Sequence, residues 1–342
     1  MKALKLDKRI VACYTFFILE VVMLKAVILF AAGLVFLIKG GDWFVDGSVG
    51  LSKRLRVPEL LIGATVVSIG TTLPEVMVSA TSAVKGHSEI AYGNAIGSII
   101  CNTALIAAIT VAVKPSGINK KALRMPVAFF FAVAVFYALN AYLFGFFSRI
   151  SGIVLLACFA AYMLFSIRSA KEKSTPEGEE QTGRKGTLIS DILWLIVGAA
   201  LIAVGARLLV DNGTVIAREL GVPESVIGLT FVALGTSLPE LVTAVTALTK
   251  GHGALSLGNI IGANTFNLVL VSGISVTLSP FSVPESSKIA GMNSSFLLDI
   301  PVMFGVMLIL TLPALIKGRL YRAQGVLLLL IYAAFCALQF IM

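Results

Sequence analysis

The chain has 342 residues, of which 58% are hydrophobic and only 13% are charged, and its mean hydropathy is +0.96. This composition excludes an ordinary soluble domain and predicts a membrane protein with many spanning segments. The net charge of +9 does not indicate a nucleic-acid-binding protein, because no basic run is interleaved with aromatic residues. The four cysteines lie singly in apolar segments without a CxxC motif, which is typical of small buried residues.

Ten apolar segments approach the roughly 20 residues that a helix needs to cross a bilayer. In chain order they cover residues 24–38, 58–83, 90–112, 125–146, 150–167, 188–210, 223–248, 254–277, 296–316 and 323–342. We therefore predict an all-α polytopic membrane protein with ten transmembrane helices, five in each half. The halves cover residues 23–167 and 188–342, and the polar stretch 168–187 is predicted to be a linker loop between them.

The placement of lysine and arginine predicts the orientation of these helices. Most of these residues follow the first, third, fifth, seventh and ninth helices, so we expect those loops, including the linker, on the cytoplasmic side. Because five is an odd number, the second half must be inverted relative to the first, as in many secondary transporters with a site near the membrane midplane. Residues 1–22 oppose the charge bias and are expected to be an extension outside both halves, either from an alternative start or as a surface helix.

One sequence occurs twice. Residues Val57–Glu75 read VPELLIGATVVSIGTTLPE and Val222–Glu240 read VPESVIGLTFVALGTSLPE, with 12 of 19 residues identical at an offset of 165 positions. The same offset relates two pairs of asparagines, Asn94 with Asn259 and Asn102 with Asn267. A carboxylate inside a spanning helix costs about 2.5–3.5 kcal/mol, so it usually faces an interior cavity and a functional partner. Two carboxylates at equivalent places therefore predict one shared site.

The chemistry of the repeated motif points to hard cations. Proline and glycine in GTTLPE and GTSLPE are expected to interrupt their helices and to free backbone carbonyls. Thr71, Thr72 and Glu75 lie at i, i+1 and i+4, so their oxygens can converge. The second motif repeats them as Thr236, Ser237 and Glu240. An all-oxygen set without His or Cys suits Ca²⁺ and Na⁺ rather than Zn²⁺.

A second polar row follows each motif. Asn94, Ser98 and Asn102 are spaced i, i+4 and i+8, so they lie along one helical face. Asn259 and Asn267 match the two asparagines, whereas Ala263 replaces Ser98. The asparagines are expected either to contribute oxygens to the site or to form hydrogen bonds between helices, and the neighbouring GxxxG pairs indicate close helix packing.

The doubled GTTLPE and GTSLPE, each followed by GN-x-IG-x-x-x-x-N, resemble the two α-repeats of the sodium/calcium exchanger family within the cation/calcium antiporters. The resemblance covers essentially all of Met23–Met342 and implies ten helices, four central cation positions and Ca²⁺ and Na⁺ as transported ions, with no other cofactor. Carried over by motif position, the implied ligands are Thr71, Thr72, Glu75, Ser98, Asn102, Thr236, Ser237, Glu240 and Asn267. Asn267 stands where similar members have Asp, and Ala263 stands where they have Ser, which leaves the sodium stoichiometry open.

We expect an antiporter, not an enzyme, that exports Ca²⁺ in exchange for Na⁺ across a prokaryotic cell membrane, with the lipid bilayer but no protein or nucleic acid as partner. The two glutamates carry a charge of −2 when ionised, which one Ca²⁺ or two Na⁺ would neutralise. Ca²⁺/H⁺ exchange is an alternative that the amides at the second-row positions favour. Further alternatives are a cation channel with the glutamates as a selectivity ring and an intramembrane enzyme, for which a nucleophile or histidine cluster is missing.

Overall fold

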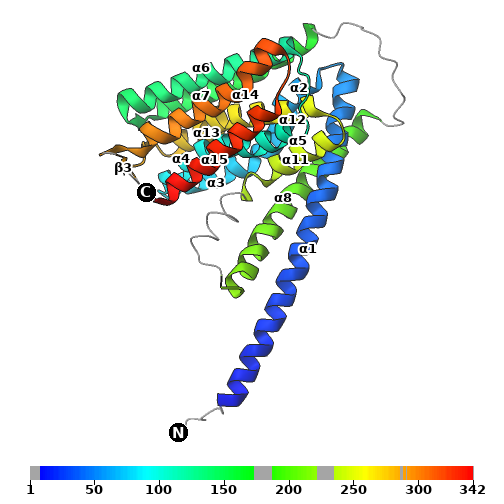
Figure 1. Ribbon diagram of the computed structural model, residues 1–342, viewed down its shortest axis with the longest axis vertical. Helices are drawn as coiled ribbons and strands as arrows, with labels where there is room; N and C mark the ends of the chain where they lie inside the picture. Colours follow the sequence, from blue (N-terminus) through cyan, green and yellow to red (C-terminus); the bar gives the residue numbers. More distant parts are fainter. Residues whose placement is uncertain (1–7, 173–186, 222–234, 286–287, 290, 342) are drawn as a thin grey trace.

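The computed structural model of the chain describes residues 8–172, 187–221, 235–285, 288–289 and 291–341. Nearly all of this part of the chain is helical (Figure 1). The helices of the first half are α1 (Lys8–Leu55), α2 (Glu59–Ile62), the π-helix η1 (Gly63–Val67), α3 (Ser68–Val84), α4 (Ser88–Cys101), the π-helix η2 (Asn102–Ala107), α5 (Ala108–Val113), α6 (Lys120–Phe144) and α7 (Arg149–Glu172). Those of the second half are α8 (Leu188–Glu219), α11 (Leu238–Thr249), α12 (Gly253–Phe266), the π-helix η4 (Asn267–Val271), α13 (Ser272–Leu278), the π-helix η5 (Ser295–Asp299), α14 (Ile300–Lys317) and α15 (Arg322–Ile341). Four short strands are β1 (Phe146–Phe147), β2 (Phe281–Ser282), β3 (Lys288–Ile289) and β4 (Met292–Asn293).

The helices confirm the predicted fold class. Nine helical segments of the described chain are long and apolar enough to cross a membrane. The remaining predicted segment, 223–248, contains the shorter apolar helix α11, and its residues 223–234 lie outside the described part. The protein is therefore an all-α polytopic membrane protein with two sets of five spanning segments.

The predicted extent of the first helix, residues 24–38, is wrong. α1 begins at Lys8 and continues to Leu55, so that residues 8–22 are its first turns rather than a helix of their own. The glycines after Ile38 lie within this helix and allow close packing. A Cβ added at Gly40 would lie 2.9 Å from the carbonyl oxygen of Gly198, and one at Gly47 would lie 2.6 Å from that of Asp191.

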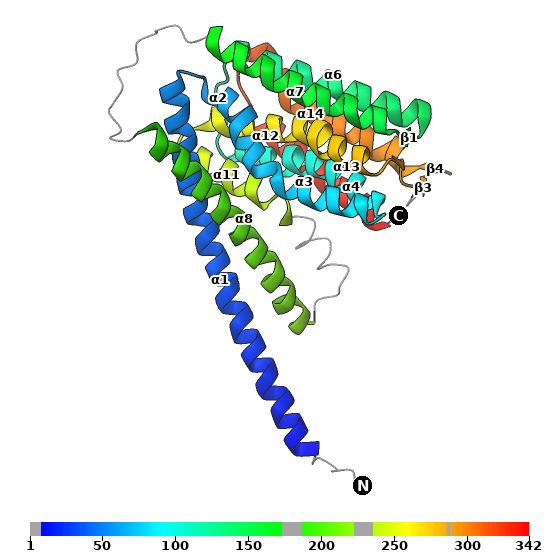
Figure 2. The same ribbon diagram turned by 180° about the vertical axis from the view of Figure 1, so that it is seen from behind.

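α1 and α8 form an antiparallel pair that stands at a steep angle to the other helices (Figures 1 and 2). A Cβ added at Gly33 would lie 2.9 Å from the carbonyl oxygen of Gly205, and one at Gly205 would lie 2.9 Å from that of Gly33. Gly40 and Gly198 show the same mutual approach, at 2.9 and 2.8 Å. The 165-residue offset converts Gly33 into Gly198 and Gly40 into Gly205. Each half therefore presents the same two glycines to the other, as a two-fold axis between inverted halves requires.

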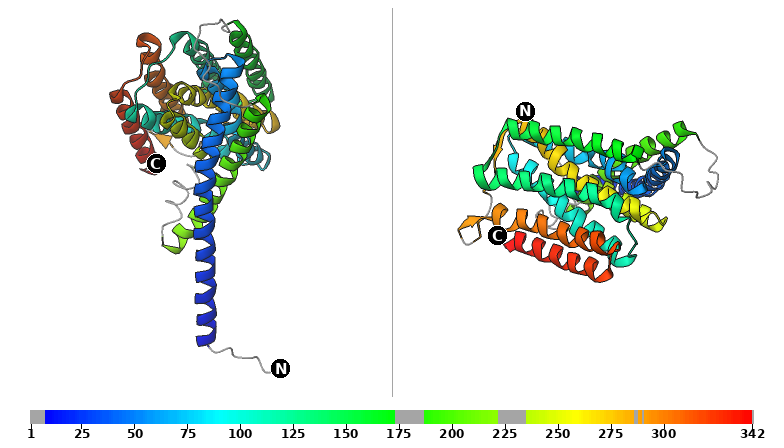
Figure 3. Two further views of the ribbon diagram at one scale, coloured as in Figure 1. Left: turned by 90° about the vertical axis from the view of Figure 1, so that its right-hand side faces the viewer. Right: turned by 90° about the horizontal axis from the view of Figure 1, so that it is seen from above.

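The remaining helices are arranged in layers around the repeated motifs (Figure 3). Seen from above, α6 and α7 lie at one edge and α14 and α15 at the other. Between them lie α3 and α4 of the first half and α12 and α13 of the second. The first turns of α1 extend beyond this bundle. The motif helices consequently have protein on their flanks, which shields their polar groups from lipid.

Loops of the two halves also contact each other reciprocally, as the glycines of α1 and α8 do. Gly117, in the loop after α5, forms an antiparallel bridge with Arg319, in the loop between α14 and α15. Ser282, which the 165-residue offset relates to Gly117, pairs with Phe146 in the loop between α6 and α7. The loop that contains Gly117 in the first half and the equivalent loop that contains Ser282 in the second half thus each pair with a loop of the opposite half.

Ion pairs join α1 to the second half. Arg54, in the last turn of α1, pairs with the buried Asp191 in the first turn of α8. Lys250, after α11, lies 3.2 Å from a carboxylate oxygen of Asp42 and 3.1 Å from one of Asp46. Asp42 and Asp46 thus anchor the part of α1 that lies beyond the predicted end at Ile38.

Candidate ion-binding site

The first motif lies on a helix that continues through its proline. Thr71, Thr72 and Glu75 are buried on α3, and Pro74 lies inside the same helix. The predicted interruption at this motif is therefore wrong. Pro74 still lacks the N–H that would bond to the carbonyl of Gly70 one turn earlier. Packing on neighbouring helices holds the turn in helical form, while that carbonyl loses its regular partner.

The second motif lies at the start of a helix. Thr236 and Ser237 form a turn, and Ser237 is the N-cap of α11, with Pro239 in the first turn. Glu240 is fully buried in the first turn of α11, Ser237 is buried and Thr236 is half-buried. Pro239 thus falls at a helix start, where a missing N–H costs nothing, and the chain before Gly235, on which the predicted interruption depends, lies outside the described residues.

The second polar row ends in two π-helical turns. Asn102 begins η2 and Asn267 begins η4, at positions related by the 165-residue offset. Both asparagines are fully buried, and Ser98 is buried one turn before Asn102. η2 contacts α11, whereas η4 contacts α3, so each asparagine lies on a segment that packs against the motif helix of the other half. Single π-helical turns are frequent at functional sites because they change the direction of the side chains that follow.

The polar atoms of this cluster share one property. Among the residues that the structure describes, both carboxylate oxygens of Glu75 and of Glu240 are buried without a hydrogen-bond partner. The same is true of every polar side-chain atom of Thr72, Asn102, Ser237 and Asn267. Buried polar groups are nearly always hydrogen-bonded, so a cluster of exceptions requires a specific explanation.

Several contacts bring the two halves of the cluster together. The carboxyl groups of Glu75 and Glu240 lie near enough for their charges to interact, and Thr71 lies beside Glu240. The Thr71 hydroxyl donates to Oδ1 of Asn259 at 3.2 Å, and the Thr236 hydroxyl donates to Oδ1 of Asn94 at 3.4 Å. The hydroxyl of Ser98 has no such link to the motif residues among the described contacts. These contacts bring Thr71, Glu75 and Glu240 together, and they link Thr236 to the first half through Asn94.

Comparison with known proteins agrees with this arrangement. The sequence pattern described as sodium/calcium exchanger protein matches residues 25–168 and 190–341, which is most of the chain. The chain belongs to the sodium/calcium exchanger family. Its helix count, doubled motif and pair of buried carboxylates are those that the resemblance implied.

Relatives within the exchanger family match three quarters or more of the chain. The sodium/calcium exchanger MaX1 of Methanosarcina acetivorans is 33% identical over 90% of this chain and 96% of its own length. Inner membrane protein YrbG of Escherichia coli is 37% identical over 75% of this chain and 81% of its own. A solved structure of the sodium-calcium exchanger NCX_Mj is 31% identical and superposes with a TM-score of 0.79, covering 92% of this chain and 99% of that one.

Asn94 forms hydrogen bonds between helices, which is one of the two roles expected for the asparagines. Nδ2 of Asn94 donates to the Ser79 hydroxyl at 2.8 Å and to the carbonyl oxygen of Glu75 at 3.2 Å. The Ser68 hydroxyl donates to the carbonyl oxygen of Asn259 at 2.9 Å. The signal in the sequence was the identity of Asn94 and Asn259 at the repeat offset, but their partners depend on how the halves dock.

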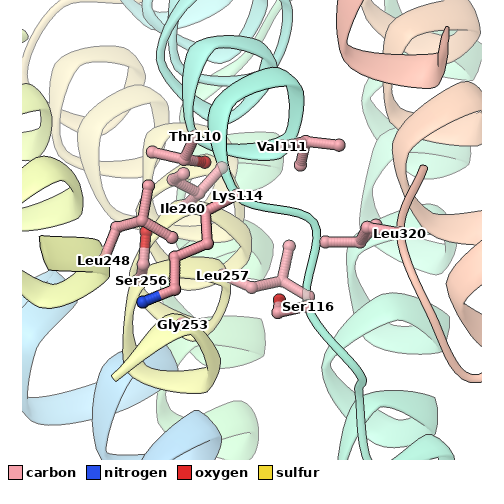
Figure 4. Close-up of a pocket in the computed structure, with 10 residues that line it drawn as sticks. All are labelled: Thr110, Val111, Lys114, Ser116, Leu248, Gly253, Ser256, Leu257, Ile260 and Leu320. Atoms are coloured by element: carbon pink, nitrogen blue, oxygen red, sulfur yellow. The ribbon is translucent and has the colours of Figure 1, made fainter. Parts of the chain in front are cut away.

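Two small cavities lie near the exchanger's central helices. One, of about 10 Å³ and therefore room for about one water molecule, is lined by both motif prolines and by Phe44, Gly70, Thr71, Ala199, Ile202 and Ala203. It places the motifs directly against the α1–α8 pair. The other, of similar size, lies between α5, α11 and α12 (Figure 4). The residues that line this second cavity include Lys114 and no carboxylate, so the charge around the cavity is unfavourable for a cation.

Proposed function

We propose that this exchanger moves Ca²⁺ across the membrane in exchange for Na⁺ by alternating access, with the ions bound between Glu75 and Glu240. The observation that carries the proposal is the buried cluster of carboxylate, amide and hydroxyl oxygens without hydrogen-bond partners among the described residues. The proposed ligands are oxygens of Thr71, Thr72, Glu75, Ser98, Asn102, Thr236, Ser237, Glu240 and Asn267.

The charge and number of these oxygens suit the two cations. Ca²⁺ binds about six to eight oxygens and tolerates irregular geometry. Two ionised carboxylates supply −2, which one Ca²⁺ or two Na⁺ balance, so the ions compete for one set of charges. Asn102 and Asn267 add oxygens without adding charge. Names of relatives support the choice of ions, because MaX1 and NCX_Mj are called sodium/calcium and sodium-calcium exchangers.

Alternating access rests on the inverted halves, for which we propose the bounds 23–167 and 188–342. Contacts that exchange between the halves, such as those of Gly33 with Gly205 and of Gly40 with Gly198, support two conformations related by swapping the roles of the halves. We place the linker 168–187 on the cytoplasmic side of a prokaryotic cell membrane and residues 1–22 outside both halves.

Ca²⁺/H⁺ exchange is the second candidate. The equivalent residues Asn102 and Asn267 are both amides, so the site holds only the two carboxylates, and each can carry either a proton or part of the cation's charge. Uptake of ⁴⁵Ca²⁺ into proteoliposomes separates the candidates. We expect uptake to be driven by an outward Na⁺ gradient and not by an outward K⁺ gradient. Uptake driven only by a pH gradient would establish H⁺ coupling, and uptake without any coupled ion would indicate a channel.

Substitution of the carboxylates tests the site itself. Glu75→Gln and Glu240→Gln each remove half of the negative charge, so each is expected to abolish Na⁺-driven Ca²⁺ uptake while the protein remains folded in detergent. Glu89→Gln is the matched control, because Glu89 is exposed in the first turn of α4. Near-normal uptake by either buried-site variant would contradict a shared site.

A further inference from the structure

We propose that Asn94 and Asn259 are positioning residues that hold the hydroxyl protons of Thr236 and Thr71 away from the transported cation. This inference rests on the proposed ion site and adds two residues that act through its threonines. Each asparagine belongs to the half opposite to the threonine it controls. The two threonines then present only lone pairs to the ion.

The two contacts are reciprocal. Thr71 of the first half donates to Asn259 of the second at 3.2 Å, and Thr236 of the second donates to Asn94 of the first at 3.4 Å. The 165-residue offset relates both the two threonines and the two asparagines. One contact alone could be an ordinary hydrogen bond between helices. The same contact made twice, across the two-fold relation and within the motifs, indicates a role in the site.

The direction of the hydrogen bond between Thr236 and Asn94 follows from the surroundings of Asn94. Its Nδ2 lies 3.2 Å from the carbonyl oxygen of Glu75, which can only accept. The amide nitrogen must therefore face Glu75, and Oδ1 must face Thr236. Since an amide oxygen cannot donate, the Thr236 hydroxyl supplies the proton.

The consequence for the ion follows from the hydroxyl group itself. A hydroxyl carries one proton and two lone pairs. Thr71 lies beside Glu240, and a proton donated to that carboxylate would point into the space where a cation binds. Oδ1 of Asn259, at 3.2 Å, is nearer to the Thr71 hydroxyl than the other printed acceptor, the carbonyl oxygen of Ser68 at 3.5 Å. With the proton on Asn259, the hydroxyl and carboxylate oxygens can face the same cation. Partners that orient metal ligands in this way typically change metal affinity by about 10- to 100-fold when they are removed.

The two asparagines are held differently. Asn94 is fixed from both ends, because the Ser79 hydroxyl accepts from Nδ2 at 2.8 Å. The position equivalent to Ser79 is Ala244, and Nδ2 of the buried Asn259 has no partner among the described residues. Truncation of Asn259 therefore leaves fewer groups unsatisfied than truncation of Asn94, which makes it the safer variant for folding.

The experiment is a double-mutant cycle in each half of the site. Asn259→Ala is combined with Thr71→Val, and Asn94→Ala with Thr236→Val. The readouts are the half-saturating Ca²⁺ concentration for Na⁺-driven uptake and the rise in melting temperature that Ca²⁺ produces in detergent. We expect each asparagine variant to raise the half-saturating concentration by about 10-fold or more. In the valine background, loss of the asparagine should add less than about twofold.

Asn264→Ala is the matched control. Asn264 is also a buried asparagine of α12 that donates across the halves, to the Thr103 hydroxyl at 2.7 Å, but it does not contact the motifs through a hydrogen bond in the described structure. Its truncation should lower the melting temperature without ions and leave the half-saturating Ca²⁺ concentration unchanged.

Two outcomes would overturn the inference. Asparagine variants with wild-type Ca²⁺ affinity would show that the hydroxyl protons need no acceptor. An effect of equal size in the valine background would show that the asparagines act by packing. Failure of the proposed exchange itself is distinguishable, because the wild-type protein would then show no Na⁺-driven uptake.

Discussion

Gly262→Ala is expected to weaken ion binding by separating the two halves at the site. A Cβ at this position would lie 2.2 Å from the Ser68 hydroxyl oxygen and 2.6 Å from both the Cα and the carbonyl oxygen of Ala64. The Ser68 side chain can rotate away, whereas the backbone at Ala64 cannot. Ordinary contact begins near 3.4 Å, so α12 and η1 must part by about 0.8 Å if neither deforms.

The size of the effect follows from the neighbouring hydrogen bond. Asn259 lies three residues before Gly262 on α12, and Thr71 lies three residues after Ser68 on α3. The same displacement therefore acts on the hydrogen bond between Thr71 and Asn259. The distance between the Thr71 hydroxyl and Oδ1 of Asn259 would then increase from 3.2 Å to about 4 Å, which is too long for a hydrogen bond. We expect overpacking to cost about 1–3 kcal/mol of stability, and the half-saturating Ca²⁺ concentration to rise about 10-fold.

The assay compares Na⁺-driven ⁴⁵Ca²⁺ uptake and thermal denaturation of Gly262→Ala with those of the wild type and of Gly305→Ala. Gly305 lies on α14, and no described atom is within 4 Å of a Cβ added there. That control should be neutral or gain about 0.4–1 kcal/mol, because alanine restricts the unfolded chain. Wild-type Ca²⁺ affinity in Gly262→Ala would refute the requirement for close approach of α12 and η1.

Two further predictions concern single side chains. Asp191→Asn removes the charge that faces Arg54 and should therefore lower the melting temperature. The expected loss of stability is about 1–2 kcal/mol, because the arginine side chain is 33% exposed and the ion pair is partly screened by solvent. Ca²⁺ affinity should not change, and a change would place this pair in the transport cycle. Asn267→Asp adds a third buried carboxylate on η4, which packs against α3, the helix that carries Glu75. Like charges there favour protonation in the absence of a cation. Ca²⁺ uptake should therefore become more dependent on pH near neutrality and more sensitive to external Na⁺, and identical profiles would show that residue 267 does not face the ions.

The sequence predicted the helices and the motif residues because both depend on local composition. Apolar length identifies a spanning helix wherever its neighbours lie, and a carboxylate inside such a helix marks an interior site. The extent of α1 was not predictable in this way. Gly40 and Gly47 are of a residue type that is common in loops, and only their packing against the backbone of α8 explains why they are helical.

The details of the site depended on tertiary contacts. Pro74 and Pro239 occupy equivalent positions, yet α3 continues through the first and α11 begins at the second. The π-helical turns at Asn102 and Asn267 likewise have no signal in residue type. The equivalence of Asn94 and Asn259 was visible in the repeat, but the partner of each lies in the other half and became known only from the docked helices.

The crossed hydrogen bonds of Thr71 and Thr236 have a consequence for biosynthesis. When the first five helices have entered the membrane, Thr71 and Glu75 are in place, but Asn259 and Glu240 have not yet been made. Neither half contains a complete site, so a nascent chain cannot gain stability from cations until the later helices dock. A ligand that binds only the completed site stabilises only the completed protein. Ambient Ca²⁺ and Na⁺ would thus favour the last step of assembly and leave an unfinished or misdocked chain at a disadvantage.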